Sequence, residues 1–333
     1  MTFFLGALLA AVLVALVAAK GPPTSWSCEQ VQDDQLLAKT SAFWRKENCT
    51  AGNDAYFIIH SLHVDLTSKD VRVLPGYSMD ASQPLLPINK MAATYGPDAK
   101  LIAGINGGYF WRTDITGFWV DDVCRGKLRS DANKPVDSCE QHPNNGLHDG
   151  SLIVDGKVVG CNCDKWGYSR PALLATPGDS ADWSVKVLER GQQADASVKM
   201  ALAAGPNLVS YDPATGAARI DIPSGEDNIN RFEHAAQTAV GLNFAPQAEG
   251  GKATKMVLVT SDGRECLEDK SCGLSDPYLA SLMLYHFNAQ SALSMDQGGS
   301  TTAWVAGAPN DGIVSNAGGG ARAVANGLFI QAL

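Results

Sequence analysis

The sequence predicts an α+β protein in which a mixed β-sheet core is flanked by helices within one large domain. Short apolar segments recur between turn residues, which is the pattern expected of strands. Near the C-terminus, a helical segment that begins at Asp276-Pro277 joins two apolar segments, 255–260 and 291–295. Such a strand–helix–strand unit is expected to form a right-handed parallel crossover. No internal repeat and no linker divides the 333 residues, so we expect a single large domain.

The N-terminal residues predict export. Residues 1–19 carry no charged side chain, and Val17-Ala18-Ala19 offers small residues for cleavage by a signal peptidase. No Lys or Arg precedes the apolar run, so an uncleaved membrane anchor is the alternative. We expect a signal peptide over 1–19, a disulfide-pinned segment over 20–55 and the main domain over 56–333. The protein is then secreted or held in the lumen of the secretory pathway.

Eight cysteines in an exported chain predict disulfide bonds. They are Cys28, Cys49, Cys124, Cys139, Cys161, Cys163, Cys266 and Cys272. We expect Cys28 to pair with Cys49, and Cys266 with Cys272. Cys161 and Cys163 are too close to bond easily to each other, which leaves Cys124 and Cys139 as their expected partners in an order that stays open. No Cys-x-x-Cys occurs, so no zinc site is expected.

The charge balance limits the class of partner. The net charge is -9, and an acidic surface disfavours nucleic acids and anionic membranes. His60 and His63 lie three apart on a predicted strand and so point to opposite faces, which argues against a metal site there. We expect no cofactor, and a small-molecule or glycan substrate. The sequon Asn48-Cys49-Thr50 permits glycosylation.

Periodicity and turn residues predict the remaining elements. A helix is expected over 86–95, and the helix from Asp276 should carry His286 at the edge of the core. A hairpin is expected around Asp155-Gly156. The polar stretch 112–148 is expected to form a lid or rim. Strands are expected over 56–66, 71–74, 101–105, 171–175, 183–188, 238–243 and 255–260.

The stretch 291–302 is the clearest candidate for a site. An apolar run ends at Asp296, Gly298 and Gly299 permit backbone conformations closed to other residues, and three hydroxyl residues follow at 300–302. A carboxylate, glycines and hydroxyls at a strand end suit an anion or a sugar. The alternative is a Gly-Ser surface turn. The position between two apolar segments favours a site.

The parallel crossover would bring a second group of polar residues to the same place. It puts Asp262-Gly263-Arg264 and Asp296 at one sheet edge, where open α/β sheets bind ligands. Two carboxyl groups suit glycoside cleavage, and Arg264 and Arg322 suit a phosphate. The alternatives are an ordinary turn for Asp262 and a surface ion pair for Arg322. The segment 106–109 also follows a strand, as a hairpin turn or as a second loop of the same pocket.

Six motifs together resemble the phosphodiester glycosidase family, from about residue 100 to the C-terminus. They are Ile105-Asn-Gly-Gly-Tyr-Phe110, Ala204-Gly-Pro-Asn-Leu208, Thr238-Ala-Val-Gly241, Ser261-Asp-Gly-Arg264, Met295-Asp-Gln-Gly-Gly-Ser300, and Asn316 followed by Arg322-Ala-Val-Ala-Asn-Gly-Leu328. The resemblance implies one catalytic domain with a mixed sheet and helices. It also implies a hydrolase that cleaves a sugar-1-phosphodiester, such as an N-acetylglucosamine-1-phosphodiester, to free sugar and a phosphomonoester.

The resemblance assigns roles to individual residues. The catalytic set is Asp296, Asp262, Arg264 and Arg322. The substrate-binding set is Asn106, Gly107, Gly108, Tyr109, Gln237, Gln297, Gly298, Gly299, Ser300, Thr301 and Asn316. In this hypothesis the arginines hold the phosphate. Asp296 stabilises the oxocarbenium-like centre or activates water, and Asp262 positions it.

Three positions depart from the family's pattern. Ser261 replaces an aliphatic residue, Gln237 replaces an arginine, and Gln297 replaces a glycine. The change at 237 removes a cation from the phosphate site, and the change at 297 puts a side chain into a glycine turn. A secreted, non-catalytic carbohydrate- or phosphosugar-binding protein is therefore the alternative. A serine hydrolase built on Ser300 ranks last, because the Gly-x-Ser-x-Gly elbow is missing.

Overall fold

The computed structural model describes most of the chain after its N-terminal residues. The described residues are 22–31, 34–51, 55–80, 82–111, 147–160, 170–176, 182–189, 192–222, 234–246, 251–263, 273–318 and 320–333. Outside them lie the expected signal peptide, most of the loop 112–148, Arg264, and the cysteines Cys124, Cys139, Cys161, Cys163, Cys266 and Cys272. Among the described residues, no helix is long and apolar enough to cross a membrane.

The fold is built mainly from antiparallel sheets, so the predicted α+β class with flanking helices is wrong. The described strands form sheets of nine, five, five and two strands, and their pairings are antiparallel. The helices are short. They are α2, Ile88–Ala93, and α5, Asp276–Ser281, which continues in a π-helical turn, Leu282–His286. Strands that follow each other at short intervals with turn residues between them are typical of antiparallel sheets.

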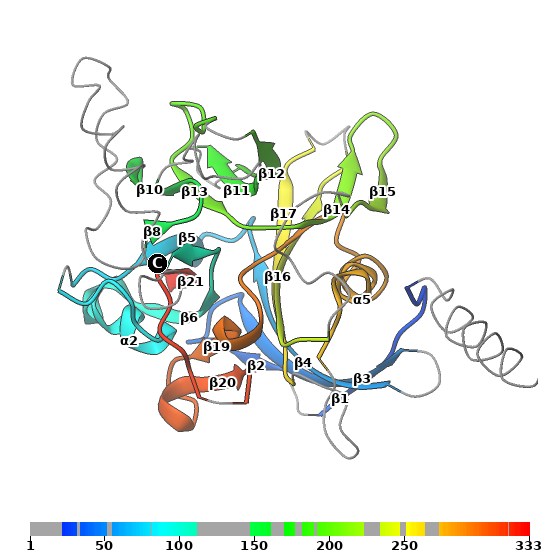
Figure 1. Cartoon of the computed structure of the whole chain (residues 1–333), viewed down its shortest axis with the longest axis horizontal. Coiled ribbons are helices and arrows are strands. Elements are labelled where there is room, and N and C mark those ends of the chain that lie inside the picture. The colour runs from blue at the N-terminus through cyan, green and yellow to red at the C-terminus, as the bar shows by residue number, and fades with distance from the viewer. Residues whose placement is uncertain are drawn as a thin grey trace, which may run out of the picture.

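The largest sheet has nine strands in the order β1-β3-β4-β17-β16-β18-β14-β15, with β2 paired to β3. Its strands are β1 Ser27–Gln30, β2 Gln35–Leu36, β3 Phe43–Ala51, β4 Ala55–Asp65, β14 Asn207–Asp212, β15 Ala217–Ile220, β16 Gln237–Phe244, β17 Ala253–Ser261 and β18 Ser291–Ser294. Helix α5 packs on this sheet, where Leu279 and Met283 are fully buried together with Val259 (Figure 1).

Two five-stranded sheets complete the core. One contains β9 Leu152–Val154, β10 Lys157–Gly160, β11 Arg170–Thr176, β12 Asp182–Leu188 and β13 Met200–Ala203. The other contains β5 Val71–Tyr77, β6 Leu101–Asn106, β19 Thr302–Val305, β20 Ile313–Asn316 and β21 Asn326–Ala332. A two-stranded sheet pairs β7 Phe110–Trp111 with β8 Leu147–His148. One apolar cluster includes Leu258, Leu173 and Phe329, one from each larger sheet, so the three sheets share a core.

The connection from β17 to β18 differs from the predicted crossover in its strand pairing but agrees with it in strand direction. Strand β16 lies between them and is antiparallel to both, so β17 and β18 do not pair. Two strands that are antiparallel to the same neighbour run in the same direction. Asp262 and Asp296, which follow β17 and β18, therefore leave the sheet at the same edge, as expected.

The N-terminal segment forms an edge of the nine-stranded sheet. The predicted disulfide between Cys28 and Cys49 is present, and these residues are direct partners in the β1–β3 register. Strand β3 then pairs with β4 along its whole length. The hairpin at Asp155-Gly156 is also confirmed, since both residues have positive φ (48° and 81°) between β9 and β10.

Candidate active site

The buried side chain of Asn106, at the end of β6, joins the loop after β18 to the first residues of β16 and β19. Its amide nitrogen donates to the backbone oxygen of Asp296 at 2.6 Å. Its amide oxygen accepts from the Thr238 hydroxyl at 2.7 Å and from the Thr302 N–H at 3.0 Å. Asn106 is fully buried, so these bonds are sheltered from water. The predicted substrate-binding residue thus holds the Asp296 loop in position.

Two glycines let the segment after Asn106 approach its neighbours closely. A Cβ atom at Gly108 would lie 1.9 Å from the Ala203 carbonyl oxygen, so no larger residue fits without moving the backbone. The Gly107 carbonyl accepts a hydrogen bond from the Asp296 N–H at 2.9 Å. Asn106 and Gly107 therefore hold both backbone polar groups of Asp296, its carbonyl and its N–H.

Asp296 has an unusual acidity. Burial of the carboxyl group raises its pKa from 3.8 to about 6. The Ser300 hydroxyl, the Arg322 guanidinium and the Gln297 N–H favour the charged form and oppose this increase. A carboxyl group with a pKa near neutrality can exchange protons at physiological pH, which is what acid–base catalysis requires.

Two arginines act on Asp296, and sequence reasoning found only one. Arg322 lies over the Phe110 ring, with its Cζ 5.7 Å from the ring centre. The second is Arg170, at the start of β11, whose charge also lowers the pKa of Asp296. Arg170 is buried, lies 4.8 Å above the Tyr109 ring and donates to Asp149 at 2.8 Å. The sequence signal for Arg170 was its position as a charged residue directly before the apolar segment 171–175.

Several buried polar atoms near Asp296 have no hydrogen-bond partner among the residues that the structure describes. They are Gln297 Oε1, Thr301 Oγ1, Thr302 Oγ1, Arg322 Nε and Asn326 Oδ1. Buried polar atoms are usually paired, so a group of unpaired ones calls for an explanation. A ligand with hydroxyl and phosphate oxygens would offer partners to the donors and acceptors of this group.

Asp262 belongs to a second polar group at the same sheet edge. Its carboxylate accepts from the Ser315 hydroxyl at 2.6 Å and lies 3.2 Å from His60 Nε2. His60 is buried and stacks with Trp44 at 6.0 Å. His63 instead stacks with Phe43, so the two histidines face opposite sides of β4, as expected. Sequence reasoning did not identify His60 or Ser315 as partners of Asp262.

The remaining predicted residues differ in their surroundings. Gln237 is fully buried and its amide nitrogen donates to the Leu274 carbonyl at 2.9 Å. Gln297 has φ −111°, which any residue adopts, so a side chain fits this turn, whereas Gly298 has φ 64°. The Asn316 side chain accepts from the Gly318 N–H at 2.8 Å. The Tyr109 hydroxyl donates to the Gly205 carbonyl at 3.0 Å. Arg264 lies outside the described residues.

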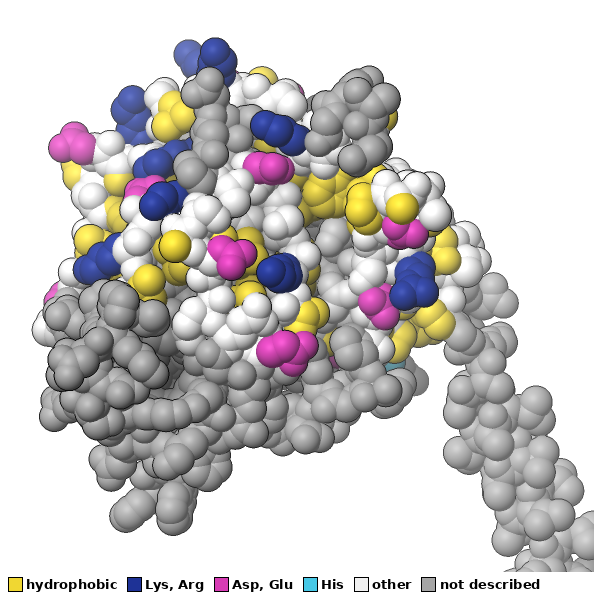
Figure 2. Space-filling view, turned by 90° about the horizontal axis from the view of Figure 1, so that it is seen from above, with side chains coloured by type: hydrophobic (Ala, Val, Ile, Leu, Met, Phe, Trp, Pro, Cys, Tyr) yellow, Lys and Arg dark blue, Asp and Glu magenta, His cyan; other side chains and the backbone are white. Residues whose placement is uncertain are grey.

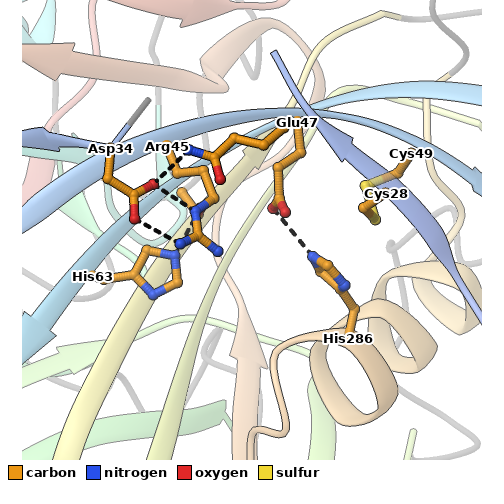
Figure 3. A network of polar contacts seen from close by, with 9 residues as sticks. Cys28, Asp34, Arg45, Glu47, Cys49, His63 and His286 are labelled. Carbon is orange, nitrogen blue, oxygen red and sulfur yellow. Dashed lines mark hydrogen bonds and ion pairs between the residues drawn. A yellow bond between two sulfur atoms is a disulfide. The ribbon is translucent and has the colours of Figure 1, made fainter. Parts of the chain in front are cut away.

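A group of possible metal ligands is found away from this site. Cys28, Cys49 and His286 lie together, but the two sulfurs form a disulfide and offer no thiolate. His286 Nε2 lies 3.1 Å from Glu47 Oε2, at the edge of the core (Figure 3).

On the face shown in Figure 2, acidic and basic side chains are interspersed.

Comparisons with known proteins identify the family and the fold. The family model of the phosphodiester glycosidases matches residues 99–331. A hypothetical protein from Synechocystis shares the fold (TM-score 0.54, 13% identity, 91% of this chain covered), and this chain spans 64% of its length. The catalytic domain of zebrafish N-acetylglucosamine-1-phosphodiester alpha-N-acetylglucosaminidase, auto-inhibited by its pro-peptide, is also similar (TM-score 0.53, 16% identity, 94% and 87% covered). So is a Burkholderia pseudomallei K96243 protein (TM-score 0.54, 13% identity, 86% and 77% covered). No curated protein sequence matches the chain.

Proposed function

Since this chain belongs to the phosphodiester glycosidase family, we propose that it is a secreted hydrolase of a sugar-1-phosphodiester, with N-acetylglucosamine-1-phosphodiester as the substrate class. The observation that carries the proposal is the surroundings of Asp296. A carboxyl group with pKa about 6 has two arginines near it, and unpaired polar atoms lie around them. A sugar phosphate offers the anion and the hydroxyl groups that such a set binds.

The reaction breaks the bond between C1 of the sugar and the phosphate oxygen. The bonding electrons leave with the phosphate, water adds to C1, and one water proton passes to a base. Ionised Asp296 stabilises the positive charge that develops at C1 or accepts that proton. Arg322 and Arg170, whose charges both act on Asp296, offset the negative charge of the phosphate. Phosphate is a good leaving group, so a dedicated general acid is less necessary than in other glycosidases.

The test is turnover of defined phosphodiesters by the purified protein. The panel contains N-acetylglucosamine-1-phospho-mannoside and UDP-N-acetylglucosamine, and released sugar is measured. Asp296→Asn and Arg322→Met should each reduce kcat/KM by about 10²-fold or more. Arg219→Met, at an exposed arginine on β15, is the matched control and should retain the wild-type rate.

The alternative of a binding protein without turnover predicts a different result. Wild-type protein would then bind the panel members and release no sugar from any of them. Absence of both binding and turnover would reject the proposed substrate class. If Arg219→Met lost as much activity as Asp296→Asn and Arg322→Met, the losses would reflect general destabilisation of the fold and would say nothing specific about the site.

A further inference from the structure

A cavity lies on the nine-stranded sheet, away from Asp296. Its volume is about 530 Å³, within the range of small-molecule sites. Lys255 lines it near the start of β17, whereas Asp262 follows the end of that strand. An extended chain rises about 3.3 Å per residue, so about 23 Å separates these two positions. The cavity is therefore distinct from the candidate active site.

Strand register places two rows of lining side chains next to each other. Asp65, Lys255 and Asn243 are direct cross-strand partners on β4, β17 and β16. Two residues before Asp65, His63 is the cross-strand partner of Phe43. Because alternate residues of a strand share a face, the polar row and the aromatic row point to the same side of the sheet.

The aromatic row forms an uncharged wall. The Phe43 and His63 rings stack at 4.4 Å with an angle of 7°, and Phe287 lies 5.9 Å from His63. Burial, and next the nearby Arg45 guanidinium, lower the pKa of His63 to about 4, so its ring is neutral at physiological pH. Arg45 Nη2 donates to Asp34 at 2.7 Å. Figure 3 shows this pair beside His63.

The polar row offers groups of opposite charge beside a carboxamide. Lys255 is exposed, and Asp65 on the next strand balances its charge. One Asp65 oxygen accepts from the Thr67 hydroxyl at 2.6 Å. The Asn243 amide nitrogen donates to the Asn288 carbonyl at 2.5 Å, and its amide oxygen remains a potential acceptor. The cavity therefore combines ring surfaces with donors and acceptors and has little net charge.

We infer that this cavity is a second binding site, which takes a neutral sugar residue of a glycan. The C–H face of a sugar ring packs against apolar and aromatic side chains, and its hydroxyl groups pair with ammonium, carboxylate and carboxamide groups. An anionic ligand is disfavoured, since the Asp65 carboxylate stands beside the Lys255 ammonium. Such a site would hold a glycan at a distance from the bond that is cleaved, and it does not depend on turnover at Asp296.

The test is direct binding, measured with the Asp296→Asn variant so that no substrate is consumed. Neutral monosaccharides and disaccharides (N-acetylglucosamine, mannose, galactose, chitobiose) are titrated by calorimetry and by ligand-observed NMR. We expect dissociation constants in the millimolar range, about −4 kcal/mol. Lys255→Met and Asp65→Asn should each weaken binding about fivefold or more, the effect of losing one hydrogen bond. Lys252→Met, at an exposed lysine just before β17, is the control and should bind like its parent.

Two results would overturn the inference. One is that none of these sugars binds the folded protein at sugar concentrations of about tens of millimolar, well above the expected dissociation constant. The other is binding that both cavity variants retain at full strength, which would locate the sugar elsewhere. Lys255→Met should also hydrolyse a small soluble phosphodiester at the wild-type rate, so failure of the proposed reaction and failure of this site are separate outcomes.

Discussion

Replacing Asp296 by Asn should stabilise the folded protein, and the gain should depend on pH. The folded carboxyl group has a pKa of about 6, against an ordinary value of 3.8. The folded state therefore holds this proton more tightly than the unfolded chain does. The contribution of the protonated group to stability is complete below about pH 4 and is lost as the pH rises through about 6. Above that pH, the wild-type protein keeps a poorly solvated carboxylate that the variant lacks.

The pKa difference sets the size of the effect. One pKa unit corresponds to about 1.36 kcal/mol, so the whole titration is worth about 3 kcal/mol. Part of this is already lost at pH 4, so the free energy of unfolding of wild type should fall by about 2.5 kcal/mol between pH 4 and pH 7.5 from this group alone. Asp296→Asn removes the titrating group. The stability of the variant minus that of wild type should therefore increase by about the same amount over this range.

Urea unfolding at pH 4, 5, 6 and 7.5 measures the difference. Asp311→Asn is a suitable control, because the Asp311 side chain is 78% exposed and has a φ of 54° that asparagine also adopts. Its stability relative to wild type should stay within about 0.5 kcal/mol at every pH. A difference between Asp296→Asn and wild type that is constant from pH 4 to pH 7.5, or that shrinks as the pH rises, would refute a raised pKa.

Three further predictions follow from the same site. Initial rates should show kcat/KM rising with pH through about 6, because the proposed reaction needs ionised Asp296, and a flat profile from pH 4.5 to 8 would contradict that role. Asn106→Ala removes three hydrogen bonds, to Asp296, Thr238 and Thr302, so urea unfolding should show a loss of about 2–4 kcal/mol, and an unchanged midpoint would contradict a stabilising role for these bonds. Arg170→Met leaves Asp149 buried without its cation and should cost about 3–5 kcal/mol, while the double variant with Asp149→Asn should recover part of that loss, since an unpaired buried charge is the main penalty.

The sequence by itself determined the local elements and the place of the two carboxylates. Alternation over 56–66 predicts a strand, and β4 confirms it. The apolar run 255–260 also predicts a strand, which β17 confirms, with every residue from Met256 to Ser261 buried. The shared edge of Asp262 and Asp296 survived the correction of the fold class, because it needs only that β17 and β18 run in the same direction. The resemblance to the family rested on short motifs at turns, and these keep their order whatever the strand pairing.

Tertiary structure alone decided which strands are neighbours and which charges meet. Periodicity describes how a segment buries its own residues and carries no information about its partner, so the insertion of β16 between β17 and β18 could not be foreseen. His60 reaches Asp262 across 202 residues of sequence. Arg170 acts on Asp296 from a different sheet, and its place before an apolar segment does not show which residue it meets. The pKa of Asp296 likewise arises from atoms packed around it by distant segments, because desolvation depends on the whole fold.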